Sequence, residues 1–357
     1  MSIGNTRKTL PLLHWLLQKY PDTPKSRAKQ WILAGRVSVD GMILRQPHQL
    51  IPDPERRLKL LERQATNLAC GAGWAIHPRV TLLFLDSSLA IIDKAPGLIS
   101  VPGAGSELSA LSILGDYLSG KLKPRDRSIA MRSLPPAFRR LQPLPVHRLD
   151  QYTSGIFCAA LNPTAREHLI EQVKGRRMGR EYVAFVEGRP AISKGTWRDW
   201  LQLTKDGMCQ HILAEARARE ALDSQDGNVP DICEAVTHYE TIAEYRLADG
   251  KEWVSKLRLR LDTGLKHQIR VQAAHAGLPL IGDRRYNPKY RQEFQSGKRI
   301  ECSRQALHAE VLSLEHPEQA GKRMTWRAEL PKDLRQLEAA LRHGNQQGHP
   351  DTATTHT

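Results

Sequence analysis

The stretch LPVHRLDQYTSGIFCAAL, residues 144–161, places a histidine, an arginine and an aspartate directly before an apolar run. That run, SGIFCAAL, has the short and continuous apolar pattern of a buried strand. An unpaired carboxylate is costly to bury, so Asp150 must be paired, protonated or used in chemistry. Arg148 lies two residues away and would share a face of an extended chain with it, so a purely structural salt bridge is one interpretation.

The composition narrows the classes of protein that fit. A chain of 357 residues with 40% hydrophobic content can hold two or three domains with real cores. It carries 53 Lys and Arg against 38 Asp and Glu, a formal net charge of +15, and its pI is near 9.8. Such an excess favours polyanionic partners, nucleic acid above all, although a basic protein without such a partner has the same composition.

The cysteines and the hydropathy indicate the compartment. Five scattered cysteines without a C-x-x-C pair fit neither a disulfide framework nor a zinc site, which favours a reducing compartment. No apolar run approaches the roughly 18 residues of a membrane span. We therefore expect a cytoplasmic protein without membrane attachment.

The first 63 residues have the pattern of a small basic module, with 12 Lys and Arg against 5 Asp and Glu, a net +7. Apolar residues at helical spacing predict one helix that ends at YPDTP, residues 20–24. A second helix is expected from Ser26 to Gly35. The stretch RVSVDGMIL then alternates around Asp40-Gly41, which is a strong hairpin signal.

The segment SRAKQWILAGRVSVDGMIL resembles the S4 RNA-binding domain over about 50 residues. The resemblance implies that Arg27, Lys29 and Arg36 face RNA phosphates. The alternative is an ordinary solvated helix face, and the accompanying hairpin pattern favours RNA.

The rest of the chain divides by composition. Residues 64–80 are glycine-rich without a clear period and are expected to be a linker, and residues 81–337 form the predicted catalytic domain. Within it, 198–233 is expected to be a surface excursion. The polar residues 338–357 are expected to be a disordered tail.

Five further stretches of the sequence bear on a site. TLLFLDSSLAIIDK predicts two buried strands separated by a turn at Asp86, Ser87 and Ser88. GAGSEL, which follows, lacks the third glycine of a dinucleotide-binding loop, and no P-loop lysine follows it. GRRMGREYVAFVEGRP, RLDTGLKHQIRVQAAHAGLPLIGDRRY and SRQALHAEVLSLEHP also place polar residues at the edges of apolar runs. Together with HRLDQYTSG they fit one cleft assembled from several strands.

These stretches resemble the RluA-type family of RNA pseudouridine synthases over residues 80 to 335, with HRLDQYTSG as the most specific motif. The resemblance implies an α+β fold, in which the small S4-like helix-and-hairpin domain precedes a catalytic domain built on a mixed, mainly antiparallel sheet. It implies an isomerase that converts a uridine in RNA to pseudouridine with neither cofactor nor metal.

The same resemblance implies roles for five residues. Asp150 is the catalytic carboxylate, either as nucleophile or as the group that starts glycosidic cleavage. Arg148 helps to expel the target nucleotide and fills the space it leaves, and Tyr182 stacks on the flipped base. Leu307 forms an apolar wall beside the tyrosine, and Arg270 pairs with the aspartate and keeps it ionised.

The chain departs from the family pattern in a few places. The family has Arg where this chain has Leu265, and His where it has Gln272, so RNA contacts near 265–272 are expected to differ. KAPG, residues 94–97, shifts the usual Lys-Pro-x-Gly order by one place. Tyr182 also fits an ordinary core tyrosine.

Three histidines, His147, His267 and His308, lie on separate motifs without the carboxylate-rich spacing of a metal site, so we interpret them as structural.

Two competing functions use the same residues. A catalytically idle RNA-binding or ribosome-assembly protein on this fold would not need Asp150, Arg148, Tyr182 and Arg270 together. A hydrolase using Ser154, His147 and Asp150 would lack the G-x-S-x-G elbow. We therefore expect an RNA partner, ribosomal RNA ahead of transfer RNA, acted on by a monomer with no obligate protein partner.

Overall fold

A computed structural model describes residues 9–346, except 34–36, 41, 45, 53–56, 61–67, 104–107, 123–133, 135, 205–206, 208–209, 224–231, 248–250 and 291–301. The chain divides into two units, residues 1–66 and 67–357.

The amino-terminal unit is a helix pair with two small sheets. Its helices are α1 (Leu12–Lys19) and α2 (Lys25–Leu33), and its sheets pair β1 (Thr9–Pro11) with β4 (Leu50–Pro52) and β2 (Val37–Val39) with β3 (Met42–Leu44) and β5 (Leu58–Leu60). The predicted hairpin is present, with Asp40 in the left-handed region at φ 54°. A core that includes Leu12, Leu16, Ile32 and Leu58 joins the helices to the strands.

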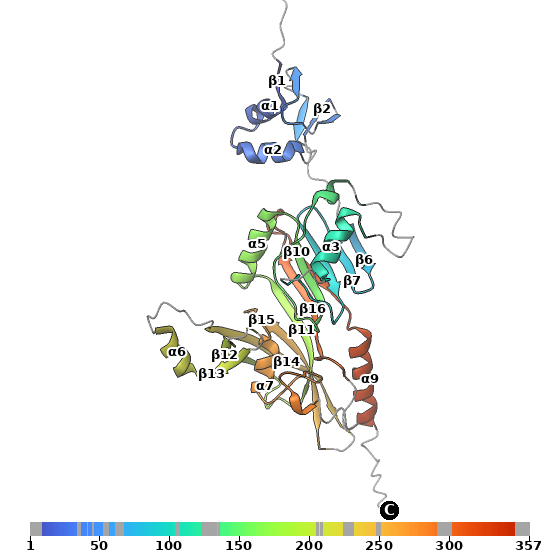
Figure 1. Ribbon diagram of the computed structural model, residues 1–357, viewed down its shortest axis with the longest axis vertical. Coiled ribbons are helices and arrows are strands. Elements are labelled where there is room, and N and C mark those ends of the chain that lie inside the picture. Colours follow the sequence, from blue (N-terminus) through green and yellow to red (C-terminus); the bar gives the residue numbers. More distant parts are fainter. Residues whose placement is uncertain are drawn as a thin grey trace, which may run out of the picture. The chain divides into compact units, whose positions relative to one another are not determined.

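The larger unit is built on one long mixed sheet, whose described strands are almost all antiparallel to their neighbours (Figure 1). Its order is β13, β12, β14, β15, β11, β16, β10, β8, β7, β6, with β17 against β16 and β9 against β10. The exception is β10, which runs parallel to β16. The strands are β6 (Leu68–His77), β7 (Val80–Leu85), β8 (Leu89–Lys94), β9 (Leu144–Pro145), β10 (Ser154–Ala160), β11 (Gly179–Glu187), β12 (Lys194–Leu203), β13 (Gln210–Leu213), β14 (Ile232–Arg246), β15 (Trp253–Leu261), β16 (Leu307–Glu315) and β17 (Arg323–Arg327). The predicted α+β class is confirmed.

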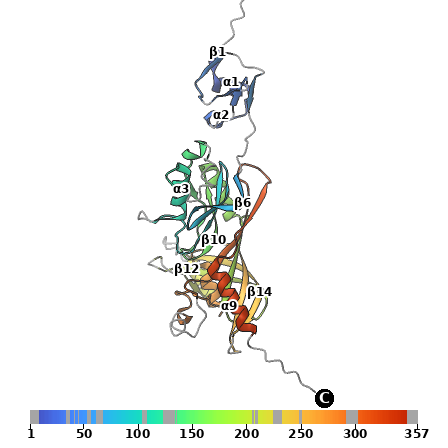
Figure 2. The same cartoon turned by 90° about the vertical axis from the view of Figure 1, so that its right-hand side faces the viewer.

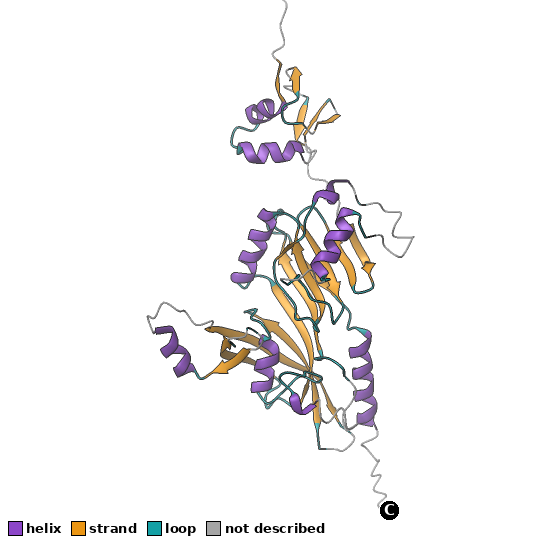
Figure 3. Ribbon diagram, viewed as in Figure 1, coloured by secondary structure: helices purple, strands orange, loops and turns teal. Residues whose placement is uncertain are grey.

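Helices cover both faces of this sheet (Figure 3). They are α3 (Ala110–Ser119), α5 (Pro163–Lys174), α6 (Glu215–Asp223), α7 (Gln268–His275) and α9 (Lys332–Gln346), with a 3-10 turn at Pro136–Arg140. Side chains of α3 and α7 share one core with alternate residues of β10, β11 and β15. The intervening residues of these strands face the opposite side, where α5 and α9 each complete a separate core. The face covered by α3 and α7 also carries Tyr182 and Leu307.

Two glycines allow close backbone approaches between neighbouring segments. Gly155 in β10 has φ 112°, and a Cβ there would collide with the backbone of Ala309 in the parallel neighbour β16. Gly282 has φ 73°, and a Cβ there would collide with the carbonyl of Arg304. Both positions therefore require glycine.

Two boundary predictions were wrong. The expected linker at 64–80 contains a ten-residue strand, β6, which pairs with β7. The pairing of β6 with β7 is interrupted by register shifts, and Gly73 has a positive φ of 78°. Because the strand is irregular, its sequence lacks the regular alternation of apolar and polar residues that predicts a strand.

The expected disordered tail at 338–357 begins inside α9, which continues to Gln346 and packs near β14 (Figure 2). Leu334, Leu337 and Leu341 are buried at helical spacing, a narrow stripe that the polar composition obscured. Residues 347–357 lie outside the described part of the chain.

The other local predictions agree with the structure in full or in part. The strands on either side of Asp86 are β7 and β8, and the Asp86 carboxylate accepts the backbone N–H groups of Ser88 and Leu89, as an Asx turn does. The expected surface excursion at 198–233 is only partly one. Where it is described, it consists of the end of β12, the short strand β13, helix α6 and the start of β14, and these three strands belong to the main sheet.

Candidate active site

Asp150 lies in a short irregular segment between β9 and β10, pinned by the chain that follows β8. Ser100 Oγ donates to the carbonyl of Leu149 and accepts its N–H. The carbonyl of Gln151 accepts Gly97 N–H at 2.9 Å and Lys94 Nζ at 3.1 Å. The backbone on both sides of Asp150 is therefore fixed by residues about 50 positions earlier in the chain.

Lys94 is a positioning residue that the sequence motifs did not single out. Its side chain is fully buried, and Nζ also donates to the carbonyls of Ala95 and Leu98. Burial, reinforced by Arg304, lowers the pKa of Lys94 to about 7, although the Asp150 and Asp93 carboxylates act in the opposite direction. The signal available in the sequence was a lysine that ends an apolar strand and meets a Gly-containing turn.

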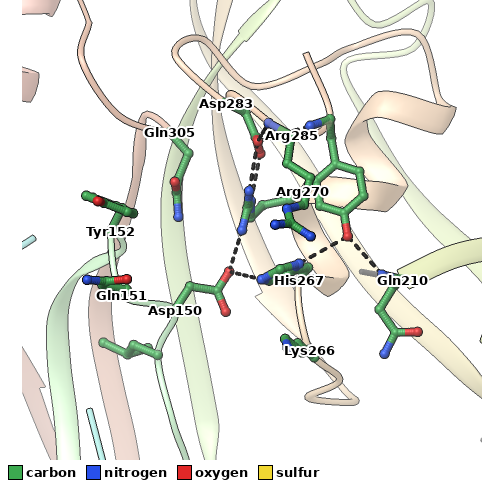
Figure 4. A network of polar contacts seen from close by, with 12 residues as sticks. Asp150, Gln151, Tyr152, Gln210, Lys266, His267, Arg270, Asp283, Arg285 and Gln305 are labelled. Atoms are coloured by element: carbon green, nitrogen blue, oxygen red, sulfur yellow. Dashed lines mark hydrogen bonds and ion pairs between the residues drawn. The ribbon is translucent and has the colours of Figure 1, made fainter. Parts of the chain in front are cut away.

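The Asp150 carboxylate is paired with Arg270 (Figure 4). Arg270 Nη1 lies 3.2 Å from Asp150 Oδ2, as the resemblance implies. The described ion pairs of Asp150 are with Arg270 and His267, so the interpretation of a structural Arg148–Asp150 salt bridge was wrong. Arg148 is exposed and lies beside the cavity.

A second carboxylate, that of Asp283, binds the other nitrogen atoms of the Arg270 guanidinium. Asp283 is completely buried and accepts Arg270 Nε at 2.7 Å and Nη2 at 2.8 Å. It also accepts the backbone N–H groups of Arg285 and Tyr286. Burial raises the pKa of Asp283, but these hydrogen bonds and the guanidinium charge outweigh it, so its pKa lies below the ordinary value. The sequence motifs did not single out Asp283, although GDRRY follows HQIRV closely in the chain.

His267 also belongs to the site, contrary to our interpretation of it as structural. Its Nε2 lies 3.9 Å from Asp150 Oδ2, and its Nδ1 lies 3.1 Å from the Tyr286 hydroxyl (Figure 4). It precedes α7 in the left-handed conformation, with φ 55°. Burial lowers the pKa of His267 to about 4, although the Asp150 carboxylate acts in the opposite direction. The signal was its spacing, because His267 and Arg270 lie three residues apart at the start of one helix.

His147 and His308 have the structural roles we expected. His147 Nε2 accepts the backbone N–H of Cys158. His308 bonds with Ser154 Oγ at 3.0 Å and with the carbonyl of Ala328. The hydrolase arrangement is therefore excluded by its geometry, since Ser154 is buried and its imidazole partner is His308 rather than His147.

Tyr182 and Leu307 are neighbours on β11 and β16, on the face that carries α7. Tyr182 pairs in register with Ala309, and Leu307 pairs with Ala184, so their side chains lie diagonally on one face. Both are buried in the same core, with the tyrosine 7% exposed. Burial, helped by the Asp150 charge and opposed by Arg180, raises the pKa of Tyr182, which keeps its hydroxyl protonated. Tyr182 and Leu307, the predicted apolar wall, are thus adjacent, and both side chains are buried.

A cavity of about 720 Å³ opens beside Asp150. Its lining comes from five segments that are far apart in the sequence, 99–103, 148–152, 266–270, 282–285 and 303–305. Six of the lining residues are cations: Arg148, Lys266, Arg270, Arg284, Arg285 and Arg304. Among the lining residues that the structure describes, Asp150 is the single carboxylate, so this lining favours a polyanionic ligand and offers it one negative group.

Leu265 and Gln272, which differ from the family pattern, make contacts between the α7 region and strands β12 and β13. Leu265 packs in a small core that includes Leu201 and Val271. Gln272 is buried and donates to Asp199 Oδ2 at 2.7 Å, and it accepts the Thr237 hydroxyl. These residues make intramolecular contacts here.

The predicted RNA contacts of the amino-terminal unit are only partly described. Arg27 and Lys29 are exposed on α2, and the Arg27 guanidinium lies 5.9 Å from the Trp31 ring. Arg36 lies outside the described residues.

Neither a metal site nor a membrane span is found in the part of the chain that the structure describes. No group of three or more His, Cys, Asp and Glu side chains there could hold an ion, and no described helix is long and apolar enough to cross a membrane.

Comparisons with known proteins show the family to which the chain belongs. A model of the RNA pseudouridylate synthase family matches residues 88–275. The ribosomal large subunit pseudouridine synthase D of Pseudomonas aeruginosa is 30% identical over 91% of this chain and 90% of its own. The proteins of the same name from Yersinia pestis and Escherichia coli K12 are each 30% identical over 92% of this chain and 89% of their own.

A solved human structure, RNA Pseudouridylate Synthase Domain Containing 4, has 20% identity and a TM-score of 0.49, over 73% of this chain and 92% of its own. That likeness is too distant to carry any part of the assignment. The family match spans more than half of the chain, and the bacterial relatives extend over nine tenths of it. The chain therefore belongs to the RluA-type RNA pseudouridine synthases and is an isomerase of RNA uridine.

Proposed function

We propose that the chain converts uridine to pseudouridine in the RNA of the large ribosomal subunit, with Asp150 as the catalytic carboxylate. The observation that carries the proposal is the Asp150 carboxylate, held by a buried arginine in a cavity whose other charged residues, among those described, are all cations or His267. The printed names of the bacterial relatives favour ribosomal RNA over transfer RNA. An enzyme with that substrate works in the cytoplasm.

Asp150 is suited to act as an anion. Arg270 lies 3.2 Å from it and is itself fixed by the fully buried Asp283, so the positive charge beside the carboxylate does not move away. The anion then attacks the target nucleotide or starts cleavage of its glycosidic bond.

The neighbouring side chains suit a flipped nucleotide. Arg148 is exposed next to Asp150 and has the reach to fill a vacated stack. The exposed Arg284 and Arg285 add charge for the phosphates near the target. Tyr182 and Leu307 offer an aromatic face and an apolar wall, which the base would reach by displacing the residues that cover them.

We also propose that the amino-terminal unit is an S4-type RNA-binding domain. Its exposed Arg27 and Lys29 on α2 would neutralise RNA phosphates and take no part in the chemistry. The larger unit would then select and convert the uridine.

The test is to map pseudouridine in ribosomal and transfer RNA from cells with and without the gene, then to incubate the purified chain with unmodified large-subunit RNA. We expect at least one large-subunit position to lose pseudouridine in the deletion and to regain it in vitro. Unchanged maps and no product would favour the idle RNA-binding alternative. A loss confined to transfer RNA would overturn the proposed substrate and leave the enzyme class intact.

A further inference from the structure

A chain of polar contacts leads from the edge of the sheet to the Asp150 carboxylate (Figure 4). The backbone N–H of Gln210, the first residue of β13, donates to the Tyr286 hydroxyl at 2.9 Å. That hydroxyl lies 3.1 Å from His267 Nδ1, and His267 Nε2 lies 3.9 Å from Asp150 Oδ2. The two rings meet edge to face, with centroids 5.7 Å apart.

Electrostatics selects one tautomer of His267. If Nε2 lacked a proton, its lone pair would face the carboxylate at 3.9 Å and repel it. The Nε2–H tautomer faces the carboxylate with a donor and leaves Nδ1 as an acceptor. Tyr286 can supply the matching donor, because its oxygen accepts from Gln210 and lies within hydrogen-bond distance of Nδ1, at 3.1 Å.

The described contacts of Asp150 are unevenly divided between its two oxygens. Arg270 Nη1 and His267 Nε2 both approach Oδ2, at 3.2 and 3.9 Å. Arg270 Nη1 donates a hydrogen bond to Oδ2, and His267 Nε2 faces the same oxygen beyond hydrogen-bond distance. Both groups favour one rotation of the carboxylate, in which Oδ1 is the oxygen turned to the substrate. His267 therefore influences which oxygen of the Asp150 carboxylate reacts with the substrate.

The strand that orients Tyr286 is itself fastened beside α7. Leu265 packs with Leu201 of β12 and Ile212 of β13, and Gln272 bonds to Asp199 of β12. Lys266 donates to the carbonyl of Gly207, just before β13. Leu265 and Gln272 are two of the residues that depart from the family pattern, so these departures help to hold β12 and β13 beside α7.

We propose that His267 is a positioning residue of the uridine isomerisation, holding Nε2–H toward Asp150 Oδ2, and that Tyr286, oriented by the β13 backbone at Gln210, fixes its tautomer. The inference deepens the proposed function, since the positioned carboxylate is the one that acts on uridine. It assigns His267 no contact with the substrate.

Three variants separate the side-chain role from the backbone role. His267→Gln carries an amide nitrogen far enough to take the place of Nε2. His267→Asn suits the left-handed backbone at φ 55° but ends near the Nδ1 position. Tyr286→Phe keeps the ring and removes the hydroxyl. The matched control is Tyr245→Phe, which removes a tyrosine hydroxyl bonded to Glu338 in a different core.

Single-turnover rates and KM are measured on large-subunit RNA, and unfolding is measured for every variant. We expect His267→Asn and Tyr286→Phe to lower the rate at saturating RNA about tenfold, with KM within about twofold, as for the loss of one oriented hydrogen bond. We expect His267→Gln to recover most of the rate, and Tyr245→Phe to leave it unchanged. Equal rates for the Gln and Asn variants, or an effect on KM alone, would overturn the proposal.

The tautomer itself is read without substrate. Long-range ¹H–¹⁵N spectra of imidazole-labelled protein distinguish Nε2–H from Nδ1–H, and His267→Asn identifies the signal by its loss. We expect Nε2–H in the wild type and a mixture in Tyr286→Phe. An unchanged signal in Tyr286→Phe would overturn the role of that tyrosine. If the wild type forms no pseudouridine in large-subunit RNA, the proposed substrate fails, while the spectra still decide the arrangement of His267.

Discussion

The cavity wall at 148–152 and the loop at 282–286 each bring one aspartate to the same arginine. The two carboxylates differ in how many hydrogen bonds they accept. Asp283 is fully buried, and each of its oxygens accepts a hydrogen bond from Arg270, while Oδ1 also accepts the backbone N–H groups of Arg285 and Tyr286. Asp150 is 18% exposed, and its described contacts go to one oxygen. Asp283, whose two oxygens both accept hydrogen bonds, holds the arginine in place. Asp150, whose described contacts go to one oxygen, can use the other oxygen in the reaction.

The largest expected effect follows from removing the reactive charge. Asp150→Asn keeps the shape of the side chain, and Arg270 keeps Asp283 as its anionic partner, so the fold is expected to remain stable. Pseudouridine formation is expected to fall by about 10⁴-fold or more, as for the loss of an essential catalytic group. Single-turnover assays and RNA-binding titrations on the same sample check both statements. Measurable turnover near the wild-type rate would contradict the assignment of Asp150.

Replacing the other aspartate, Asp283, by asparagine is expected to lower the stability of the fold. Asp283→Asn leaves a buried guanidinium without its bidentate partner, which costs about 3–5 kcal/mol in free energy of unfolding. Chemical denaturation measures the loss, with Asp22→Asn, an exposed aspartate, as the matched control. If Asp283→Asn proved as stable as the wild type, or if Asp150→Asn lost as much, the division between a holding and a reacting carboxylate would be wrong.

An acid-dependent effect of intermediate size is expected beside the cavity wall. Burial lowers the pKa of His267 from 6.5 to about 4, so between these values the unfolded chain binds a proton that the folded chain does not. Its share of the stability is therefore lost as the pH falls from about 6.5 to about 4, up to about 3 kcal/mol. His267→Gln does not titrate and is expected to lose less stability over that window in urea unfolding at a series of pH values. Identical pH profiles for the two proteins would contradict the burial effect.

The smallest expected effect concerns charges that are not buried at all. Arg27 and Lys29 are exposed on α2, so they are expected to contribute to RNA affinity through counterion release and to leave the chemistry alone. The double change to alanine should reduce the slope of log affinity against log salt by about 0.7–0.9 for each phosphate that is no longer neutralised. Binding titrations over a salt series measure the slope. A collapse of the saturated rate would show instead that the amino-terminal unit takes part in the site.

Local sequence patterns were sufficient where neighbouring residues decide the structure. The apolar runs on either side of Asp86 predicted β7 and β8, and Asp40-Gly41 predicted the hairpin of β2 and β3. They failed where the partner of a segment lies elsewhere. The glycine-rich segment of β6 is a strand because β7 pairs with it, and α9 is a helix whose leucine stripe faces the sheet.

The sequence by itself determined several strand-forming segments, such as β7 and β8, together with the basic charge and the motif that contains Asp150, because these depend on residue type and short-range spacing. Resemblance then supplied Arg270 as the partner of the aspartate. Only the tertiary structure decided that Asp283 holds that arginine, that His267 faces Asp150 and that Lys94 pins the adjacent backbone. The pairing of Asp150 with Arg270 spans 120 residues, and such contacts are set by how the strands and α7 assemble in the sheet rather than by any local pattern.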